Sequence, residues 1–372
     1  TSFFNSTVKG VLSSSKDKLL LPSTTKRIRS NFAILLNIIF CTFFSIVSFV
    51  LILVWFKDGH FYGGGDVGLP TYNPMRIFQI DRYIWWEAIA PGFLIPHVIT
   101  SITLYFFLSF FQFFGLGPVG IQAILFFALL FLMGFGMYLL TLSIYGGDKK
   151  ILATIAGLFY IFNPYMMTQI WHRFGHTSFL FVASIPYLIL FWKLWIKKGN
   201  YLNLLFFLLV NILASYMFGT IAFVFPFWLI MSLFTISEIF LPWENKTHLI
   251  KVLWRSIVGL SFWVLFNCWW LIPVLTVSQG VASQQHNIWE SIATLLSISK
   301  QAILPYSLQM GNSFYLFDQA ELGEIYKSFF FRLIPWLGVI TIFYGIAYAL
   351  RRKHLAAYVL IYLVIIMLSK GT

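Results

Sequence analysis

Charged side chains and cysteines are both scarce in this chain. Lys and Arg number 25 and Asp and Glu 12, which is 10% of 372 residues, whereas soluble domains carry about 25%. This scarcity excludes an ordinary soluble globular domain. The two cysteines, Cys41 and Cys268, each lie within an apolar run, so they have no metal-site spacing and give no argument for a disulfide.

Apolar and aromatic residues, by contrast, are abundant. Hydrophobic residues make up 59% of the chain and aromatic residues 20%, which excludes a disordered protein. The net charge is +13, but the basic residues stand between long apolar runs rather than on one polar face. That placement excludes a soluble nucleic-acid binder and predicts an all-α polytopic membrane protein.

The apolar runs are long enough for several membrane-spanning helices. A spanning helix needs about 20 apolar residues, and its backbone must hydrogen bond internally. A polar cytoplasmic segment over 1–31 is expected to precede a transmembrane domain over 32–372, as the N-terminal piece of a longer protein. The predicted spans are 32–56, 119–145, 151–166, 178–196, 201–219, 220–242, 252–275, 329–350 and 355–369.

One further apolar run, 93–116, decides the topology. If it does not cross, 17 of the 25 Lys and Arg lie on the side of the N-terminus and 8 on the other; if it crosses, the numbers become 11 and 14. Short cytoplasmic loops are enriched in Lys and Arg, so the count favours a cytoplasmic N-terminus and an interfacial or re-entrant segment at 93–116. The alternative is a plain spanning helix.

This topology leaves three outer segments: a long first loop over 57–118, a short loop near 167–177 and a long loop over 276–328. Eight of the twelve acidic residues fall in them. The spans carry no carboxylate at their centres, which argues against an ion pump or a proton-coupled transporter. The outer, extracytoplasmic face of the cell membrane is therefore the predicted working face.

The first outer loop is the densest candidate site. Glycines at 63–65 precede Asp66, and their conformational freedom allows the carboxylate to be held on a tight turn. The alternative for Asp66 is a turn-forming residue beside glycines.

Residues 76–89 of the same loop predict an amphipathic helix in the outer leaflet. Asp81 and Arg82 fall on its wetter side, and Trp85 and Trp86 suit the headgroup layer. Asp81 and Arg82 are therefore candidates for substrate binding.

The other outer segments add possible phosphate ligands and a further acid. His172, Arg173 and His176 lie within five residues and could bind a phosphate, although interfacial snorkelling is the alternative. Lys327 and Arg332 precede or enter a span, where an Arg should snorkel or pair with an anion. Glu290, with His286 and Trp289, is a candidate substrate contact in the third loop, which could instead be a solvated cap.

Four stretches resemble the membrane part of the arabinofuranosyltransferases of the AftD type, within the GT-C glycosyltransferases. They are "DVGLPTYNPMRIFQIDRYIWWE", "GFLIPHVITSITLYFFLSFFQFFGLGPVGIQAILFF", "ATIAGLFYIFNPYMM" and "NCWWLIPVLTVSQGVASQQHNIWESIATLL". They occur in the family's order, from Asp66 to Leu296. The resemblance implies a GT-C-like helix bundle whose long first outer loop bears interfacial helices.

The resemblance also implies an activity and a site. It implies transfer of a sugar, arabinofuranose in that family, from a polyprenyl-phosphate donor. Asp66 matches the proposed catalytic residue, and Glu290 matches an acid of the later outer loop. The chain departs from the family at His172, Arg173 and His176, where the pattern is acidic or rich in hydroxyls, and it lacks the large carbohydrate-binding C-terminal part.

These observations predict an inverting glycosyltransferase with Asp66 as general base and a glycan or lipid-linked acceptor. Cations should face the departing phosphate, and Arg332, Lys327, Arg173 and His172 are the candidates. A divalent cation, Mg²⁺ or Mn²⁺, is the alternative, and no other cofactor or nucleic-acid partner is implied. The competing functions are a lipid-linked-sugar flippase or export subunit, and a non-catalytic membrane scaffold.

Overall fold

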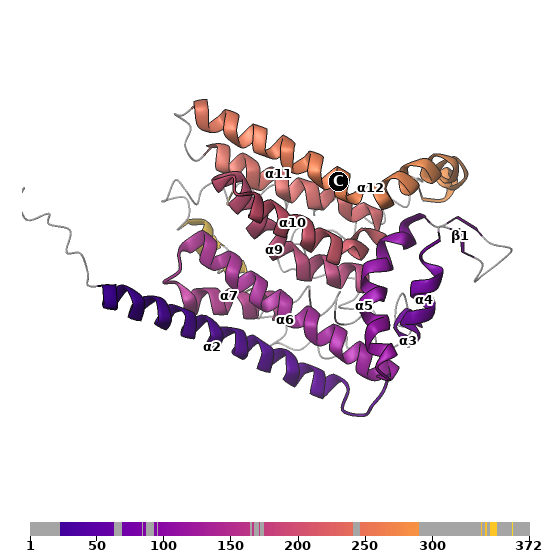
Figure 1. Cartoon of the computed structure of the whole chain (residues 1–372), viewed down its shortest axis with the longest axis horizontal. Helices are drawn as coiled ribbons and strands as arrows, with labels where there is room; N and C mark the ends of the chain where they lie inside the picture. The colour runs from indigo at the N-terminus through magenta and orange to yellow at the C-terminus, as the bar shows by residue number, and fades with distance from the viewer. Residues whose placement is uncertain are drawn as a thin grey trace, which may run out of the picture. The chain divides into compact units, whose positions relative to one another are not determined.

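The chain was analysed as a computed structural model, and its described part is almost entirely helical (Figure 1). The described residues are 23–62, 69–83, 85–86, 93–94, 96–163, 166, 171, 175–240, 246–289, 336, 339–340, 343–347 and 359. Two units are distinguished, Thr1–Ile46 and Val47–Thr372. Helix α2 (Ser23–Trp55) begins in the first unit and ends in the second.

Six helical stretches of the described residues are long and apolar enough to cross a membrane. They are Asn37–Trp55, Pro96–Phe113, Pro118–Tyr145, His176–Lys198, Ile221–Ile239 and His248–Val277. This confirms an all-α, multi-pass membrane protein. The predicted spans 329–350 and 355–369 lie mostly outside the described residues.

Six helices of the second unit pack as alternating neighbours. Helices α6 (Pro118–Tyr145), α9 (His176–Lys198) and α11 (Val224–Phe240) run in one direction. Helices α7 (Lys150–Phe162), α10 (Tyr201–Leu213) and α12 (Lys246–Trp289) return in the other. As a result, the ends of the first three and the starts of the second three meet at one end of the bundle (Figure 1).

Helices α7 and α10 correct two of the predicted spans. Each has 13 residues and is therefore about 20 Å long, whereas the hydrocarbon core is about 30 Å thick. Neither helix can cross it alone. Helix α10 stops because the chain turns into two 3-10 segments, η3 (Ser215–Gly219) and η4 (Ile221–Phe223), before α11.

Tryptophan side chains hold the bundle core together through paired N–H groups. The Trp263 indole donates to Asn211 Oδ1 at 2.9 Å, between α12 and α10. The Trp192 indole donates to Thr235 Oγ1 at 2.9 Å, between α9 and α11. These pairs matter because hydrocarbon supplies no alternative partner for a buried N–H.

The first loop, over 57–118, contains less helix than the sequence predicts. Two short helices, α3 (Leu69–Tyr72) and α4 (Pro74–Ile80), are followed by a turn. Strand β1 (Trp85–Trp86) then pairs antiparallel with β2 (Phe93–Leu94). The helix predicted over 76–89 therefore ends at residue 80, because the aromatic residues that follow favour extended backbone.

The doubtful segment 93–116 forms a 3-10 segment, η1 (Pro96–Ser101), and helix α5 (Ile102–Phe113). In Figure 1, α5 runs across the end of the bundle where α6 begins, rather than along α6 and α9. One of its faces is buried through Leu104, Tyr105 and Leu108. The opposite face exposes phenylalanines at 106, 107, 110 and 113, up to 74% for Phe113.

The depth of spin labels distinguishes the two orientations of α5. On a background without Cys41 and Cys268, we expect labels at Phe106→Cys, Phe110→Cys and Phe113→Cys to report one shared depth in the bilayer by EPR power saturation. A spanning α5 would instead give depths differing by about 10 Å over seven residues.

Leu253→Cys, Ile257→Cys and Leu260→Cys on α12 form the matched control. They have the same spacing and are also exposed, at 46%, 59% and 44%. We expect their depths to change steadily along the helix. The same steady change on α5 would refute its transverse placement in the membrane.

Glycine permits the close approach of α6 and α9. A Cβ at Gly136 would lie 2.5 Å from Tyr187 Cε2, whereas a Cβ at Gly120, on the same helix, meets its nearest atom at 3.8 Å. We expect Gly136→Ala to lower stability by roughly 1–3 kcal/mol through overpacking. Gly120→Ala should leave stability unchanged or raise it slightly. Thermal unfolding of both variants in nanodiscs measures the difference, and equal melting temperatures would contradict the packing.

Candidate functional site

Three of the nine predicted site residues fall within the described part of the chain: Asp81, Arg82 and His176. The other six lie outside it: Asp66, His172, Arg173, Glu290, Lys327 and Arg332. The geometry of the candidate site is therefore built from the residues around the first three.

The chain on either side of Asp66 is held at the start of α6. The buried Gln122 side chain accepts from the Tyr62 backbone N–H at 2.8 Å and donates to the Tyr62 carbonyl at 2.7 Å. On the other side of Asp66, α3 packs against α6. A double hydrogen bond to a buried amide fixes the entry to the loop, because breaking it would leave polar groups unpaired.

Helix α4 is tied to α5 by one side chain, Gln112. Its Oε1 accepts from the Met75 backbone N–H at 2.8 Å, and its Nε2 donates to Asn73 Oδ1 at 3.1 Å. Asn73 is also the N-cap of α4 and accepts from the Arg76 backbone N–H at 3.2 Å. The start of α4 is therefore fixed to the transverse helix.

Asp81 fixes the other end of α4, and it does so from a buried position. Its backbone N–H donates to the Ile77 carbonyl at 2.8 Å, and its carboxylate accepts from the Ser101 hydroxyl. The side chain is only 6% exposed. The prediction that Asp81 lies on the wetter side of a helix is wrong, because α4 ends before it and the chain turns inward to η1.

Hydroxyl groups continue this contact into η3. Ser215 Oγ donates to the Thr100 carbonyl at 2.7 Å and lies 2.8 Å from Thr103 Oγ1. The rings of Tyr105 and Tyr216 lie 5.8 Å apart. We define the Asp81 cluster as Asp81, Thr100, Ser101, Thr103, Tyr105, Ser215 and Tyr216. The cluster joins α4, η1, α5 and η3. Its first and last residues, Asp81 and Tyr216, are 135 positions apart in the sequence.

Burial makes the Asp81 carboxyl a weaker acid than usual. Loss of solvation raises its pKa to about 6, although the hydrogen bond from Ser101 favours the charged form. Asp81 can therefore exchange a proton near neutral pH. Perturbed carboxyls of this kind are common at functional sites, although structural networks also produce them.

Arg82 points away from the cluster. Its side chain is exposed, and its guanidinium carbon lies 5.3 Å from the centroid of the Phe78 ring. Within the described residues there is one ion pair, between Lys149 and Asp148. Arg82 thus has no described carboxylate within ion-pair distance and can face an external anion.

His176 belongs to a different environment. It is the first residue of α9, it is 3% exposed, and its ring lies 6.5 Å from that of Phe126 on α6. Among the described residues, its Nε2 has no hydrogen-bond partner. The structure therefore places His176 in an aromatic cluster away from solvent, which does not suit the predicted phosphate contact, while His172 and Arg173 lie outside the described residues.

Sequence reasoning did not identify Ser101, Gln112 or Gln122 as important. Gln112 and Gln122 are each a polar residue isolated in an apolar stretch, and that isolation is the signal that could have identified them, since such groups need a partner in the protein. Among the described residues, no group of three or more His, Cys, Asp or Glu could hold a metal ion.

Comparisons with protein-family models, with curated proteins and with solved structures find no match to this chain. A functional interpretation therefore depends on the sequence stretches described above and on the geometry of this site.

The raised pKa of Asp81 predicts a pH-dependent stability. The unfolded carboxyl has a pKa near 3.9, so the folded state binds more protons between about pH 4 and pH 6. The stabilisation that this proton gives is complete below pH 4 and is lost as the pH rises through about 6.

We expect Asp81→Asn, which has no charge to bury, to be more stable relative to the native chain at pH 7.5 than at pH 4.5. The gain is up to about 3 kcal/mol for a shift of about two pKa units. Thermal unfolding in nanodiscs at both values measures it, with the exposed Asp58→Asn as control. A melting-temperature difference that is the same at both pH values would contradict the assignment.

Proposed function

We propose that this protein is a membrane glycosyltransferase. It transfers a sugar from a polyprenyl-phosphate donor to a glycan or lipid-linked acceptor at the outer face of the cell membrane, with inversion at the anomeric carbon. The observation that carries the proposal is the transverse arrangement of α4 and α5 across one end of an apolar bundle, within the loop that resembles the AftD-type enzymes.

A lipid-linked donor has requirements that this arrangement meets. Its polyprenyl chain needs an apolar environment, its phosphate lies at headgroup level, and its sugar must reach water. The outward phenylalanines of α5 are suited to hydrocarbon, while Arg82 is exposed on the neighbouring turn. A transverse helix pair therefore offers both environments at one level of the membrane.

The chemistry needs one base and a stabilised leaving group. The acceptor oxygen forms a bond to the anomeric carbon while the bond from that carbon to the phosphate oxygen breaks, and the acceptor proton passes to Asp66. General-base assistance contributes roughly 10²–10⁴-fold. The departing polyprenyl phosphate needs no proton, so one carboxylate suffices.

The remaining residues are assigned to substrate binding. Lys327, Arg332, Arg173 and His172 would stabilise the charge that grows on the phosphate, with a divalent cation as the alternative. Arg82 is a further cation at this level. Asp81 would act from its buried position by holding α4 in place. Glu290 is a further candidate substrate contact, whereas His176 is buried and is not assigned to substrate binding. Arabinofuranose as the sugar rests on the resemblance alone.

The filled core argues against a flippase. The rings of Phe218, Trp263 and Trp270 pack against one another, with centroids 5.2–6.2 Å apart. These side chains are buried. A pathway for a lipid headgroup would need polar surface along the bundle, and this part of the described chain presents aromatic rings instead.

Substitution of Asp66 tests the proposal. With a radiolabelled polyprenyl-phosphate sugar and a glycan acceptor, we expect Asp66→Asn to lose transfer by at least about 10²-fold while donor binding and melting temperature remain unchanged. Asp58→Asn, in the same loop and exposed, is the matched control and should retain turnover. Full activity of Asp66→Asn would refute the role of Asp66. Absence of transfer by the native chain, together with lipid movement in liposomes, would favour a flippase.

A further inference from the structure

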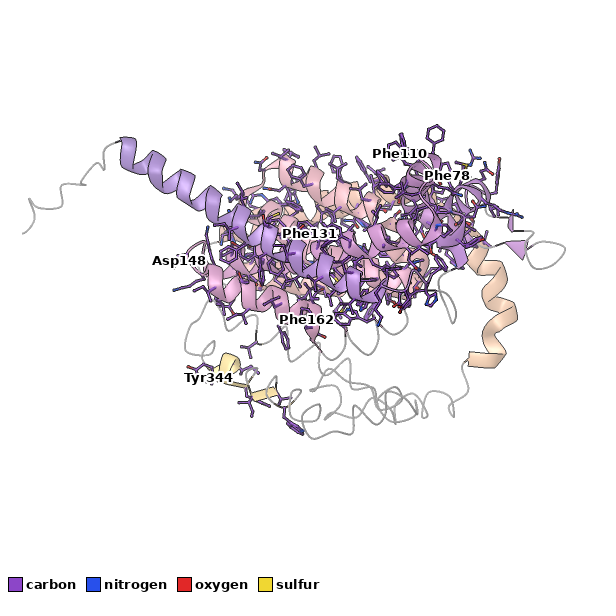
Figure 2. All side chains as sticks on the ribbon, turned by 90° about the horizontal axis from the view of Figure 1, so that it is seen from below. Phe78, Phe110, Phe131, Asp148, Phe162 and Tyr344 are labelled. Atoms are coloured by element: carbon purple, nitrogen blue, oxygen red, sulfur yellow. The ribbon has the colours of Figure 1, made fainter. Side chains whose placement is uncertain are left out.

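The bundle end opposite α4 and α5 collects exposed lysines from three different connections. Figure 2 shows Asp148 at this end and Phe78 and Phe110 at the other. We define the lysine end as the exposed side chains of Lys149, Lys197, Lys198 and Lys251. They come from the starts of α7 and α12 and from the end of α9.

Little negative charge within the described chain neutralises these lysines. Asp148 lies 3.4 Å from Lys149, and both side chains are more than half exposed. The first turns of α7 and α12 contain no acidic residue. Four lysines against one exposed carboxylate leave an excess of three positive charges at this surface (4 − 1 = 3).

The other ionic groups at this end are engaged inside the protein. The Arg255 guanidinium donates to the carbonyls of Ile196 and Lys197 at 2.8 and 3.0 Å, and so caps the last turn of α9. Lys193 is buried and donates to the Ser143 carbonyl at 3.0 Å. These contacts fix the backbone of the lysine end, whose four surface lysines are exposed.

Aromatic side chains mark the level of this surface in the membrane. Tyr145 ends α6, Tyr201 begins α10, and Trp254 lies next to Arg255 on α12; their exposures are 47%, 68% and 64%. Exposed Tyr and Trp at helix ends are typical of the headgroup layer. The lysines therefore lie where lipid phosphates are found.

We propose that the lysine end is a docking surface for anionic phospholipid headgroups, such as phosphatidylglycerol, in the adjacent leaflet. Lysines close to an anionic membrane surface each strengthen binding by on the order of fivefold, and a fixed set on one rigid bundle end acts together. Binding there stabilises the ends of α7, α9 and α12. This inference does not depend on the proposed glycosyl transfer.

Lipid retention and thermal unfolding test the proposal. In native mass spectrometry of the full chain with equal phosphatidylglycerol and phosphatidylcholine, we expect phosphatidylglycerol to be retained on the order of tenfold more. We also expect a higher melting temperature in nanodiscs that contain phosphatidylglycerol. The variant Lys149→Gln, Lys197→Gln, Lys198→Gln, Lys251→Gln should lose both effects.

The matched control removes exposed cations at the opposite end: Lys57→Gln, Arg76→Gln. It should keep the lipid preference and the stabilisation. Inorganic phosphate added to phosphatidylcholine nanodiscs at equal ionic strength should not raise the melting temperature. Equal retention of the two lipids, the same loss in the control variant, or stabilisation by free phosphate would each overturn the proposal.

Discussion

Hydrocarbon supplies no hydrogen-bond partner, so each polar group inside the bundle must find one within the protein. The Trp263–Asn211 and Trp192–Thr235 pairs meet this requirement between helices. Gln122 meets it with the backbone of Tyr62. These pairs connect neighbouring helices, and they also hold the first loop, over 57–118, at the start of α6. The candidate site depends on this constraint because its residues lie on short elements with little packing of their own.

The two ends of the bundle differ in the chemistry they present. One end carries the transverse helix α5, its outward phenylalanines and the buried carboxyl of Asp81. The other end carries lysines from three connections. Alternating helix directions produce this separation, since each reversal of the chain returns to the same two levels. The asymmetry is what a membrane enzyme needs if its substrates meet it from one side while its other side contacts lipid headgroups.

Asp81 shows how a short polar contact organises the first loop, over 57–118. Helix α4 has only seven residues and would not be stable alone. Gln112 fixes its start and the Asp81–Ser101 hydrogen bond fixes its end. Burying the carboxyl raises its pKa and costs stability above pH 6. Asp81 lies at a position that connects three elements, so this loss of stability is consistent with a positioning role for its side chain.

The sequence alone determined the class of protein, because uninterrupted apolar runs with 10% charge have few alternatives to membrane-spanning helices. It also indicated that 93–116 differs from the other runs. The tertiary structure decided the helix lengths and the neighbours, which could not be read from the local pattern. Helices α7 and α10 are too short to cross, α4 stops before Asp81, and Ser101, Gln112 and Gln122 hold the loop. Hydrophobicity depends on each residue by itself, so it can be read along the chain. A hydrogen bond such as Asp81–Ser101 depends on two residues that meet only after the chain has folded.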